Sequence, residues 1–312
     1  MQILLEIIIP VFGIVAIGYA AVKFGLFPEA ANKGLARFVF DFAIPAMLFR
    51  AMATMTLPES VDWGYIVSYY GGGGITWIIG SAISLALFRS GGLSAMIMGM
   101  SGAFSNTVLL GVPLVLTTYG EQATLPVFLL IAFHSSLLIT TATVQAEITL
   151  GSKGALRELP WNIFKGLIRN PIIVSLVLGV AFNLSGLSLP HAIDTITETL
   201  GRASLPSAVF AMGASLASYQ VRGALSASLT GVGLKLIIHP LMVWVLASYV
   251  FEIDPLWRDI AVIIAALPIG VNVYLMAERY QSAVTEAAAS LLISAALSVG
   301  SVAMVLYWLD VR

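Results

Sequence analysis

Apolar runs about twenty residues long follow one another along almost the whole chain, with only short polar segments between them. Of the 312 residues, 59% are hydrophobic and only 10% are charged, and the mean hydropathy is +0.97. Ordinary soluble domains carry about 25% charged residues, and a helix that crosses a bilayer needs about 20 apolar residues. The sequence therefore predicts an all-α polytopic membrane protein. It excludes a soluble enzyme, a nucleic-acid-binding protein and a disordered scaffold.

Glycine, proline and charged residues divide this apolar sequence into ten candidate membrane spans. We expect them at residues 2–23, 33–55, 63–88, 92–117, 122–147, 170–187, 195–217, 225–250, 258–279 and 284–308. The first span is expected to stay in the protein rather than be removed as a signal, because no basic residue precedes its apolar run. The longest connection, residues 149–169, mixes apolar and basic side chains and is predicted to lie in the cytoplasmic membrane interface.

Lysine and arginine predict the orientation, because they accumulate in cytoplasmic loops. With ten spans, the loops of one side carry ten of the 15 basic residues: Lys23, Lys33, Arg37, Arg89, Lys153, Arg157, Lys165, Arg169, Arg222 and Arg279. We therefore expect an integral protein of the plasma membrane (the inner membrane of a bacterium), surrounded by lipid, with both termini outside the cytoplasm. The net charge of −1 leaves no basic face for nucleic acid.

The chain matches itself when it is shifted by 161 positions. The shift aligns Pro10 with Pro171, Gly18 with Gly179, Gly25 with Gly186, Pro45 with Pro206, Phe49 with Phe210, Gly72 with Gly233 and Tyr119 with Tyr280. A repeat of five spans would place the second copy upside down in the membrane, which is the inverted-repeat plan of secondary transporters. The predicted units are residues 1–148 and 170–312, joined by the linker 149–169. The alternative is that glycine and proline are simply frequent in membrane helices.

The fourth and ninth spans each combine asparagine, glycine and proline inside an apolar run. The fourth contains SNTVLLGVPL at residues 105–114, and the ninth contains ALPIGVNVYLMAERY at residues 266–280. Proline removes a backbone donor and glycine permits unwinding, and broken helices near the midplane form the substrate sites of many transporters. Helix N-terminal ends that face such a gap favour an anion. The predicted substrate site contains Asn106, Gly111, Pro113, Pro268, Gly270 and Asn272; for single prolines, a simple kink is the alternative.

Together with RNPII at residues 169–173 and LPSAVFAMGASL at residues 205–216, these two segments resemble the auxin efflux carrier family in its short bacterial form. That family is related in fold to the bile acid:sodium symporters. The resemblance implies ten helices in two inverted five-helix repeats, with helices four and nine broken and crossing at Pro113 and Pro268, and with Asn106 and Asn272 near the substrate. It also implies export or exchange of small organic anions, such as auxin-like monocarboxylates or the dicarboxylates malate and malonate.

Ionisable residues inside the predicted spans are expensive to bury and are functional candidates by default. Asp41 and Arg202 stand at matching repeat positions, one turn before Pro45 and Pro206. Inversion places them about 12 Å apart along the helix axes, so direct pairing is not expected. Asp41 is a candidate for exchanging a coupling proton and Arg202 for attracting an anion. The alternative is that both charges fix helix packing.

Three further basic side chains are predicted to lie within spans. His134 is a third candidate for proton coupling, and a packed core histidine is the alternative. Lys235 and His239 are four residues apart and so share one helix face. Because Lys235 lies too deep to reach the interface easily, it is predicted to bind a substrate carboxylate or to pair with a buried acid.

These patterns favour a secondary transporter of small organic anions that works by alternating access, without cofactor or metal, and as a monomer or a homodimer. A sodium-coupled symporter of larger amphipathic anions of the bile acid type is the alternative, although residues 263–276 contain no Asp, Glu or Gln to coordinate sodium. A passive channel is a further alternative. An enzyme is not expected, because the chain has no Cys, only three His and neither an HExxH nor a GxSxG motif.

Overall fold

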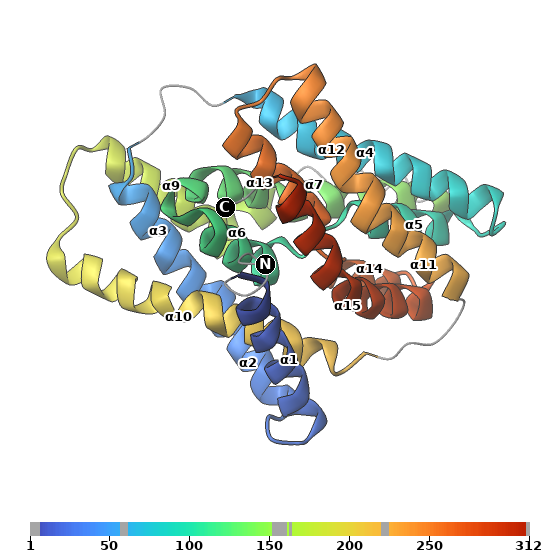
Figure 1. Ribbon diagram of the computed structural model, residues 1–312, viewed down its shortest axis with the longest axis horizontal. Helices are drawn as coiled ribbons and strands as arrows, with labels where there is room; N and C mark the ends of the chain where they lie inside the picture. Colours follow the sequence, from blue (N-terminus) through green and yellow to red (C-terminus); the bar gives the residue numbers. More distant parts are fainter. Residues whose placement is uncertain (1–6, 57–61, 152–160, 162–163, 220–224, 310–312) are drawn as a thin grey trace.

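The computed structural model describes residues 7–56, 62–151, 161, 164–219 and 225–309, and its elements there are helices plus one isolated β-bridge (Figure 1). The α-helices are α1 (Ile9–Lys23), α2 (Glu29–Phe38), α3 (Ile44–Thr54), α4 (Trp63–Ala86), α5 (Gly92–Ala103), α6 (Val112–Tyr119), α7 (Thr124–Leu150), α9 (Pro171–Leu184), α10 (His191–Leu216), α11 (Leu225–Gly233), α12 (His239–Val245), α13 (Pro255–Ala266), α14 (Asn272–Arg279) and α15 (Val284–Trp308). Wider π-helical turns occur at η2 (Val39–Ala43), η3 (Thr107–Gly111), η5 (Leu234–Ile238) and η6 (Leu246–Val250). The predicted all-α class is confirmed.

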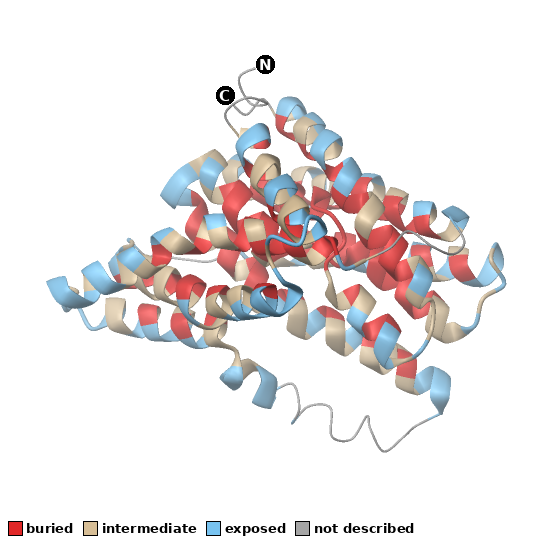
Figure 2. Cartoon of the chain, turned by 90° about the horizontal axis from the view of Figure 1, so that it is seen from below, coloured by how far each residue is buried: buried red, intermediate tan, exposed pale blue. Residues whose placement is uncertain are grey.

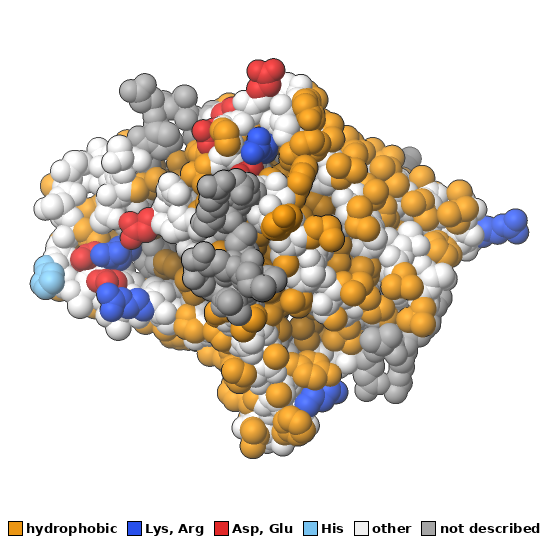
Figure 3. Space-filling view, viewed as in Figure 1, with side chains coloured by type: hydrophobic (Ala, Val, Ile, Leu, Met, Phe, Trp, Pro, Cys, Tyr) orange, Lys and Arg blue, Asp and Glu red, His pale blue; other side chains and the backbone are white. Residues whose placement is uncertain are grey.

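Three helical stretches are long and apolar enough to cross a membrane by length and composition: Thr107–Leu150, Leu225–Val250 and Val284–Trp308. Shorter apolar helices accompany them, among them α1, α5 and α9. On the face drawn in Figure 3, apolar side chains gather over the right and lower parts, and most charged side chains lie at the left, at the top and at the edges. This distribution is typical of a protein surrounded by lipid. Most of the predicted interfacial linker lies outside the described residues, as do Lys153, Arg157 and Arg222 of the orientation argument.

The helices form two groups (Figure 1). The scaffold group consists of α1, α2, η2, α3, α9 and α10, which pack on one another. The crossing group consists of the remaining helices, which pack around α13; residues 260–266 of α13 are all fully buried. This stretch reads IAVIIAA and is apolar around its whole circumference, which allows it to be enclosed on every side. Buried residues accordingly gather in the interior of the molecule in Figure 2.

Glycines set the closest helix contacts in the scaffold group. A Cβ atom on Gly18 of α1 would overlap the Phe210 carbonyl of α10, and a Cβ atom on Gly179 of α9 would lie 2.8 Å from the Phe49 carbonyl of α3. Small residues of this kind let helix backbones approach closely. The two contacts are reciprocal under the 161-position shift, which aligns Gly18 with Gly179 and Phe49 with Phe210. Each of the two matching segments supplies the glycine of one contact and the phenylalanine carbonyl of the other.

Three of the π-helical turns end two residues before a proline. They are η2 before Pro45, η3 before Pro113 and η5 before Pro240. Proline has no N–H for the carbonyl four residues earlier, and its ring collides with that carbonyl in a regular α-helix. A wider turn, in which residues bond five positions apart, moves that carbonyl away. Local widening therefore lets these helical segments continue through their prolines.

Replacing Gly18 with alanine is expected to lower the thermal unfolding midpoint of the detergent-solubilised protein, because the added methyl group overlaps the Phe210 carbonyl. Overpacking of this kind costs about 1–3 kcal/mol. Gly13→Ala on the same helix is the matched control, since nothing lies within 4 Å of the Cβ atom that it adds. Equal midpoints for the two variants would contradict the close contact between α1 and α10.

Candidate functional site

Two helices, α5 and α13, end inside the crossing group, and the residues that follow them meet. These extended residues form an antiparallel β-bridge between Ser105 and Ile269. The chain then returns to helix in η3 and α6 on one side and in α14 on the other. We call residues 104–106 and 268–270 the crossing. Pro113, which the family resemblance places at the crossing, lies beyond it in α6.

The backbone of each break binds the backbone of the other. The Asn106 N–H donates to the Pro268 carbonyl at 2.9 Å, and the Gly270 N–H donates to the Phe104 carbonyl at 3.0 Å. In the apolar interior of a membrane protein, a backbone group without a partner is costly. The reciprocal bonds explain how two interrupted helices are tolerated at the same place.

Gly111 and Gly270 are needed for close approach between the two breaks. A Cβ atom on Gly270 would lie 2.7 Å from the Phe104 ring, and a Cβ atom on Gly111 would lie 2.7 Å from the Leu267 side chain. Neither glycine has a positive φ angle. Their role is therefore to leave room for the neighbouring chain, and it differs from the backbone freedom that the sequence suggested.

Asn106 and Asn272 lie where the chain passes from the crossing into the second half-helix on each side. Both side chains are half-buried, and neither makes a hydrogen bond within the described residues. The N–H groups of Val108, Leu109, Val271 and Asn272 also have no acceptor in that part of the chain. Free N–H groups at the positive end of a helix dipole favour an anion, so the two helix starts at the crossing are suited to carboxylate binding.

His134 of α7 and Tyr69 of α4 hold the first break. His134 is 1% exposed, and its Nε2 lies 3.2 Å from the Ser105 nitrogen and 3.1 Å from the Ser105 carbonyl oxygen. The Tyr69 hydroxyl lies 3.3 Å from Ser105 Oγ and 3.4 Å from His134 Nδ1. The protonation of the ring decides whether Nε2 accepts from the N–H or donates to the carbonyl. A proton on His134 is thus linked directly to the backbone of the crossing.

Ser294 of α15 and Lys235 of η5 hold the second break. The Ile269 N–H donates to Ser294 Oγ at 3.1 Å. The Lys235 ammonium donates to the carbonyl of Ala265, near the end of α13, and lies 3.3 Å from His239 Nδ1. Lys235 and His239 therefore contact each other along one helix face, as their spacing predicts. Ser294 and Tyr69 were missed by sequence reasoning, because a single hydroxyl in an apolar run gives no distinctive signal.

Two pockets lie between α10 and the crossing group. The smaller has a volume of about 40 Å³ and is lined by Asn106, Leu109, Ile269 and Val271 beside the crossing, by Met212, Ser215, Leu216 and Tyr219, and by Leu291 and Ala295. A water molecule needs about 10–15 Å³ by the same kind of measure, so this pocket is large enough for water but too small for a dicarboxylate. Asn272 and Lys235 are not among the residues that line it.

The larger pocket, about 430 Å³, lies toward the opposite end of α10, between α3, α10 and the turn from α6 to α7. Its volume falls within the range of about 300–1,000 Å³ that is typical of ligand pockets. Its polar and charged lining consists of Arg50, Thr54, Glu121, Thr124, Thr197, Glu198 and Arg202. This pocket does not reach Asn106, so it is separate from the crossing, and we call it the vestibule.

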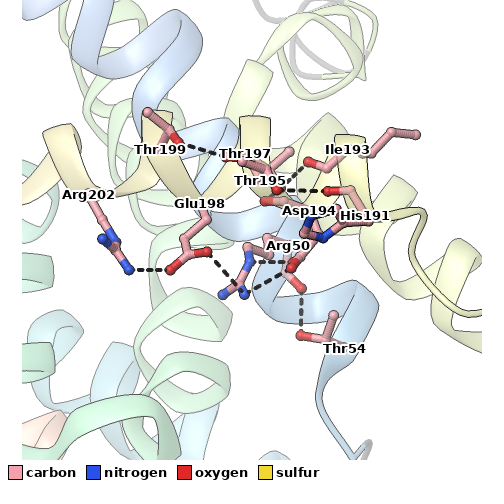
Figure 4. A network of polar contacts seen from close by, with 10 residues as sticks. All are labelled: Arg50, Thr54, His191, Ile193, Asp194, Thr195, Thr197, Glu198, Thr199 and Arg202. Carbon is pink, nitrogen blue, oxygen red and sulfur yellow. Dashed lines mark hydrogen bonds and ion pairs between the residues drawn. The ribbon is translucent and has the colours of Figure 1, made fainter.

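An ion-pair network borders this vestibule (Figure 4). Arg50 of α3 lies between two carboxylates of α10, with Nε at 2.6 Å from Asp194 and Nη2 at 3.8 Å from Glu198, and Arg202 binds Glu198 at 2.5 Å. Asp194 and Glu198 were missed by sequence reasoning, although their four-residue spacing with Arg202 places all three on one helix face. The two positive and two negative charges balance, so Arg202 faces the vestibule as a paired ion.

Asp41 and Arg202 pair with residues of their own helical segments and not with each other. Asp41 lies 3.1 Å from Arg37, whereas the Arg202 side chain, paired with Glu198, is 79% exposed. Exposed ion pairs of this kind contribute about 0–1 kcal/mol to stability. Of the three coupling candidates from the sequence, His134 is the one that contacts the crossing.

Replacing Ser294 with alanine removes the acceptor of the Ile269 N–H and is expected to lower the thermal unfolding midpoint in detergent. Leaving a buried donor without a partner costs about 1–3 kcal/mol. Ser298→Ala is the matched control on the same helix, because Ser298 is equally buried and bonds only the Ala295 carbonyl of its own helix. If both variants unfold at the same temperature, Ser294 does not support the second break.

Comparisons with known proteins agree with these features. A family model described as membrane transport protein matches residues 3–152 and 152–306. A Rhizobium meliloti (strain 1021) protein named "Putative malonate transporter" is 29% identical over 301 residues, which cover 96% of this chain and 94% of that protein. A Methanothermobacter thermautotrophicus protein named "Uncharacterized transporter" is 26% identical over 266 residues, 84% of each chain.

A Mus musculus protein named "Lysosomal cholesterol signaling protein" is 26% identical over 219 residues, which cover 65% of this chain but 24% of that protein. The family match extends over nearly the whole chain and confirms the auxin efflux carrier type that the motifs indicate. Together with the apolar helices, it identifies an integral membrane protein that transports a solute and is not an enzyme. The chain belongs to the membrane transport protein family.

Proposed function

We propose that this protein is a secondary transporter of small organic anions that binds its substrate at the crossing, between Asn106 and Asn272. The observation that carries the proposal is the meeting of two broken helices whose following half-helices begin with free N–H groups. Carboxylate is the anion that fits such donors in a metabolite. The relative named for malonate supports a small dicarboxylate as the cargo.

The proposed layout is ten spans in two inverted repeats, residues 1–148 and 170–312, with residues 149–169 between them. Support comes from the order of helices, because α1, α2–α3, α4, α5–α6 and α7 are followed in the same order by α9, α10, α11–α12, α13–α14 and α15. The reciprocal contacts of Gly18 and Gly179 support it as well. Both termini then lie outside the cytoplasm of a cell whose plasma membrane holds the protein.

Alternating access would move the crossing group against the scaffold group. Both pockets lie along α10, one at each end of the contact between the groups. Arg202, at the vestibule, and Ser215, at the small pocket, are 13 residues apart, which is about 20 Å along a helix. A displacement that opens the small pocket and closes the vestibule would expose Asn106 from the opposite side of the membrane.

Coupling to protons is proposed to act through His134, with Asp41 and Arg202 as outer candidates. The support is that His134 alone of the three bonds the crossing, so its protonation changes a contact at the substrate site. A sodium-coupled carrier of larger amphipathic anions is the alternative function. The small pocket beside Asn106 disfavours it, because a bulky anion would need a much larger opening.

Uptake of malonate, malate and indole-3-acetate into proteoliposomes tests the cargo, with an Asn272→Asp variant as the site test. We expect saturable uptake of at least one acid by the unmodified protein. The variant places a negative charge at the helix start and is expected to raise KM roughly tenfold or more, since one unit of charge repulsion near a surface is worth several kcal/mol. Gln281→Glu, which makes the same charge change at an exposed position beyond α14, should leave KM unchanged. No uptake of any acid would overturn the proposed function; equal KM values would overturn the site.

A His134→Gln variant tests the coupling, because glutamine keeps an amide near the Ser105 backbone but cannot carry a proton at neutral pH. Uptake by the unmodified protein is expected to rise when a proton gradient is imposed, and the variant is expected to lose this stimulation while retaining basal uptake. His191→Gln, at the exposed start of α10, is the control and should behave like the unmodified protein. Stimulation by a sodium gradient in place of a proton gradient would favour the alternative function.

A further inference from the structure

Lys235 is completely enclosed by the protein. Its exposed fraction is 0%, and it projects from η5 in the middle of the stretch Leu225–Val250. Among the described residues, its ammonium group has two polar neighbours, the Ala265 carbonyl and His239 Nδ1. No carboxylate of the described residues lies within ion-pair distance of it. A buried charge is tolerated only where other groups compensate for its lost hydration.

The Ala265 carbonyl needs a donor because α13 is interrupted. In a continuous helix it would accept from the N–H of Ile269, four residues later. That N–H instead donates to Ser294, and Pro268 has no N–H to offer to the preceding carbonyl. The last carbonyls of a helix also carry the negative end of its dipole. The Ala265 carbonyl oxygen therefore lacks a main-chain donor and carries negative charge from the helix dipole. The Lys235 ammonium donates to it.

The groups around Lys235 are all basic or neutral. His239 comes from the same helical stretch, and the Tyr69 ring of α4 packs against both the His239 ring and the His134 ring of α7. The acid of α13, Asp259, is near the start of that helix and is paired with Arg258 at 2.8 Å. Among the described residues, Lys235 therefore pairs with a carbonyl at the end of α13 and not with an acidic side chain. Pairing with a buried acid was one of the two roles predicted for it.

We propose that Lys235 is a positioning residue that acts as a tethered cation for the end of α13 and holds the second break open. Half-helix ends and unwound carbonyls in transporters are places where free monovalent cations bind. Here the ammonium of the chain itself occupies that position. Removing the side chain creates a site that accepts a free ammonium or sodium ion. The proposal requires only the crossing; its transport test rests on the proposed function, whereas its stability test does not.

The stability test compares thermal unfolding midpoints of the purified, full-length protein in choline chloride, sodium chloride and ammonium chloride at equal ionic strength and pH. The unmodified protein should unfold at the same temperature in all three salts, because its site is filled. Lys235→Ala should unfold at a lower temperature in choline chloride and recover in part with sodium or ammonium. Lys235→Met should be lowered without recovery, because its side chain fills the space. Leu236→Met, at a buried neighbouring position, is the control and should resemble the unmodified protein.

Three outcomes would overturn the proposal. They are a Lys235→Met variant as stable as the unmodified protein, a midpoint of the unmodified protein that rises selectively with sodium or ammonium, and a destabilised Lys235→Ala variant that neither ion restores. If Lys235→Ala does not fold, the first two comparisons still decide. In proteoliposomes, Lys235→Met is expected to lower the maximal uptake rate by about tenfold or more, as misplacement of a site from a distance does, with KM unchanged. A raised KM at an unchanged maximal rate would instead assign Lys235 to the substrate.

Discussion

The exchange of backbone hydrogen bonds between two interrupted helices is the constraint on which the rest of this structure depends. An apolar interior offers no water to an unpaired N–H or carbonyl, so each break needs the other at close range. Asn106 and Gly270 donate across the crossing. These bonds require glycine where the two chain segments approach. They also leave main-chain groups of Ser105, Ile269 and Ala265 that the other break cannot reach, and His134, Ser294 and Lys235 bind these groups. The contacts of these three side chains with the main chain follow from this single need.

Features that depend on local sequence could be predicted. Apolar runs gave the helical class, and the combination of asparagine, glycine and proline marked both interrupted helices, because each of these residues disturbs a helix by its own chemistry. The four-residue spacing of Lys235 and His239 correctly placed the two side chains on one helix face, where they contact each other. Asp41 and Arg202 were also expected not to meet, and each bonds within its own helical segment.

Features that depend on contacts between distant segments could not be read from the sequence. The acceptor of Lys235 is a main-chain oxygen, which every residue possesses, so the sequence around Ala265 does not distinguish it. Serine is an ordinary residue in membrane helices, so Ser105 and Ser294 do not stand out in the sequence. They become important only because Ser105 and Ile269 form the β-bridge and the Ile269 N–H donates to Ser294. Gly111 and Gly270 were identified, but for backbone freedom; only the proximity of Phe104 and Leu267 explains why a larger residue would not fit.

The reciprocal glycine contacts of the scaffold group have a consequence for biosynthesis. Gly18 belongs to α1, which is synthesised well before α10, yet the surface it fits is on α10. The predicted sequence repeats therefore differ from the two groups of helices, because the scaffold group combines α1, α2 and α3 with α9 and α10. During synthesis α1 has to remain in the lipid with its glycine face uncovered until α10 has been inserted. Assembly of the scaffold group is consequently a late, long-range event, and a chain that ends after α7 would lack the α10 surface on which α1 packs.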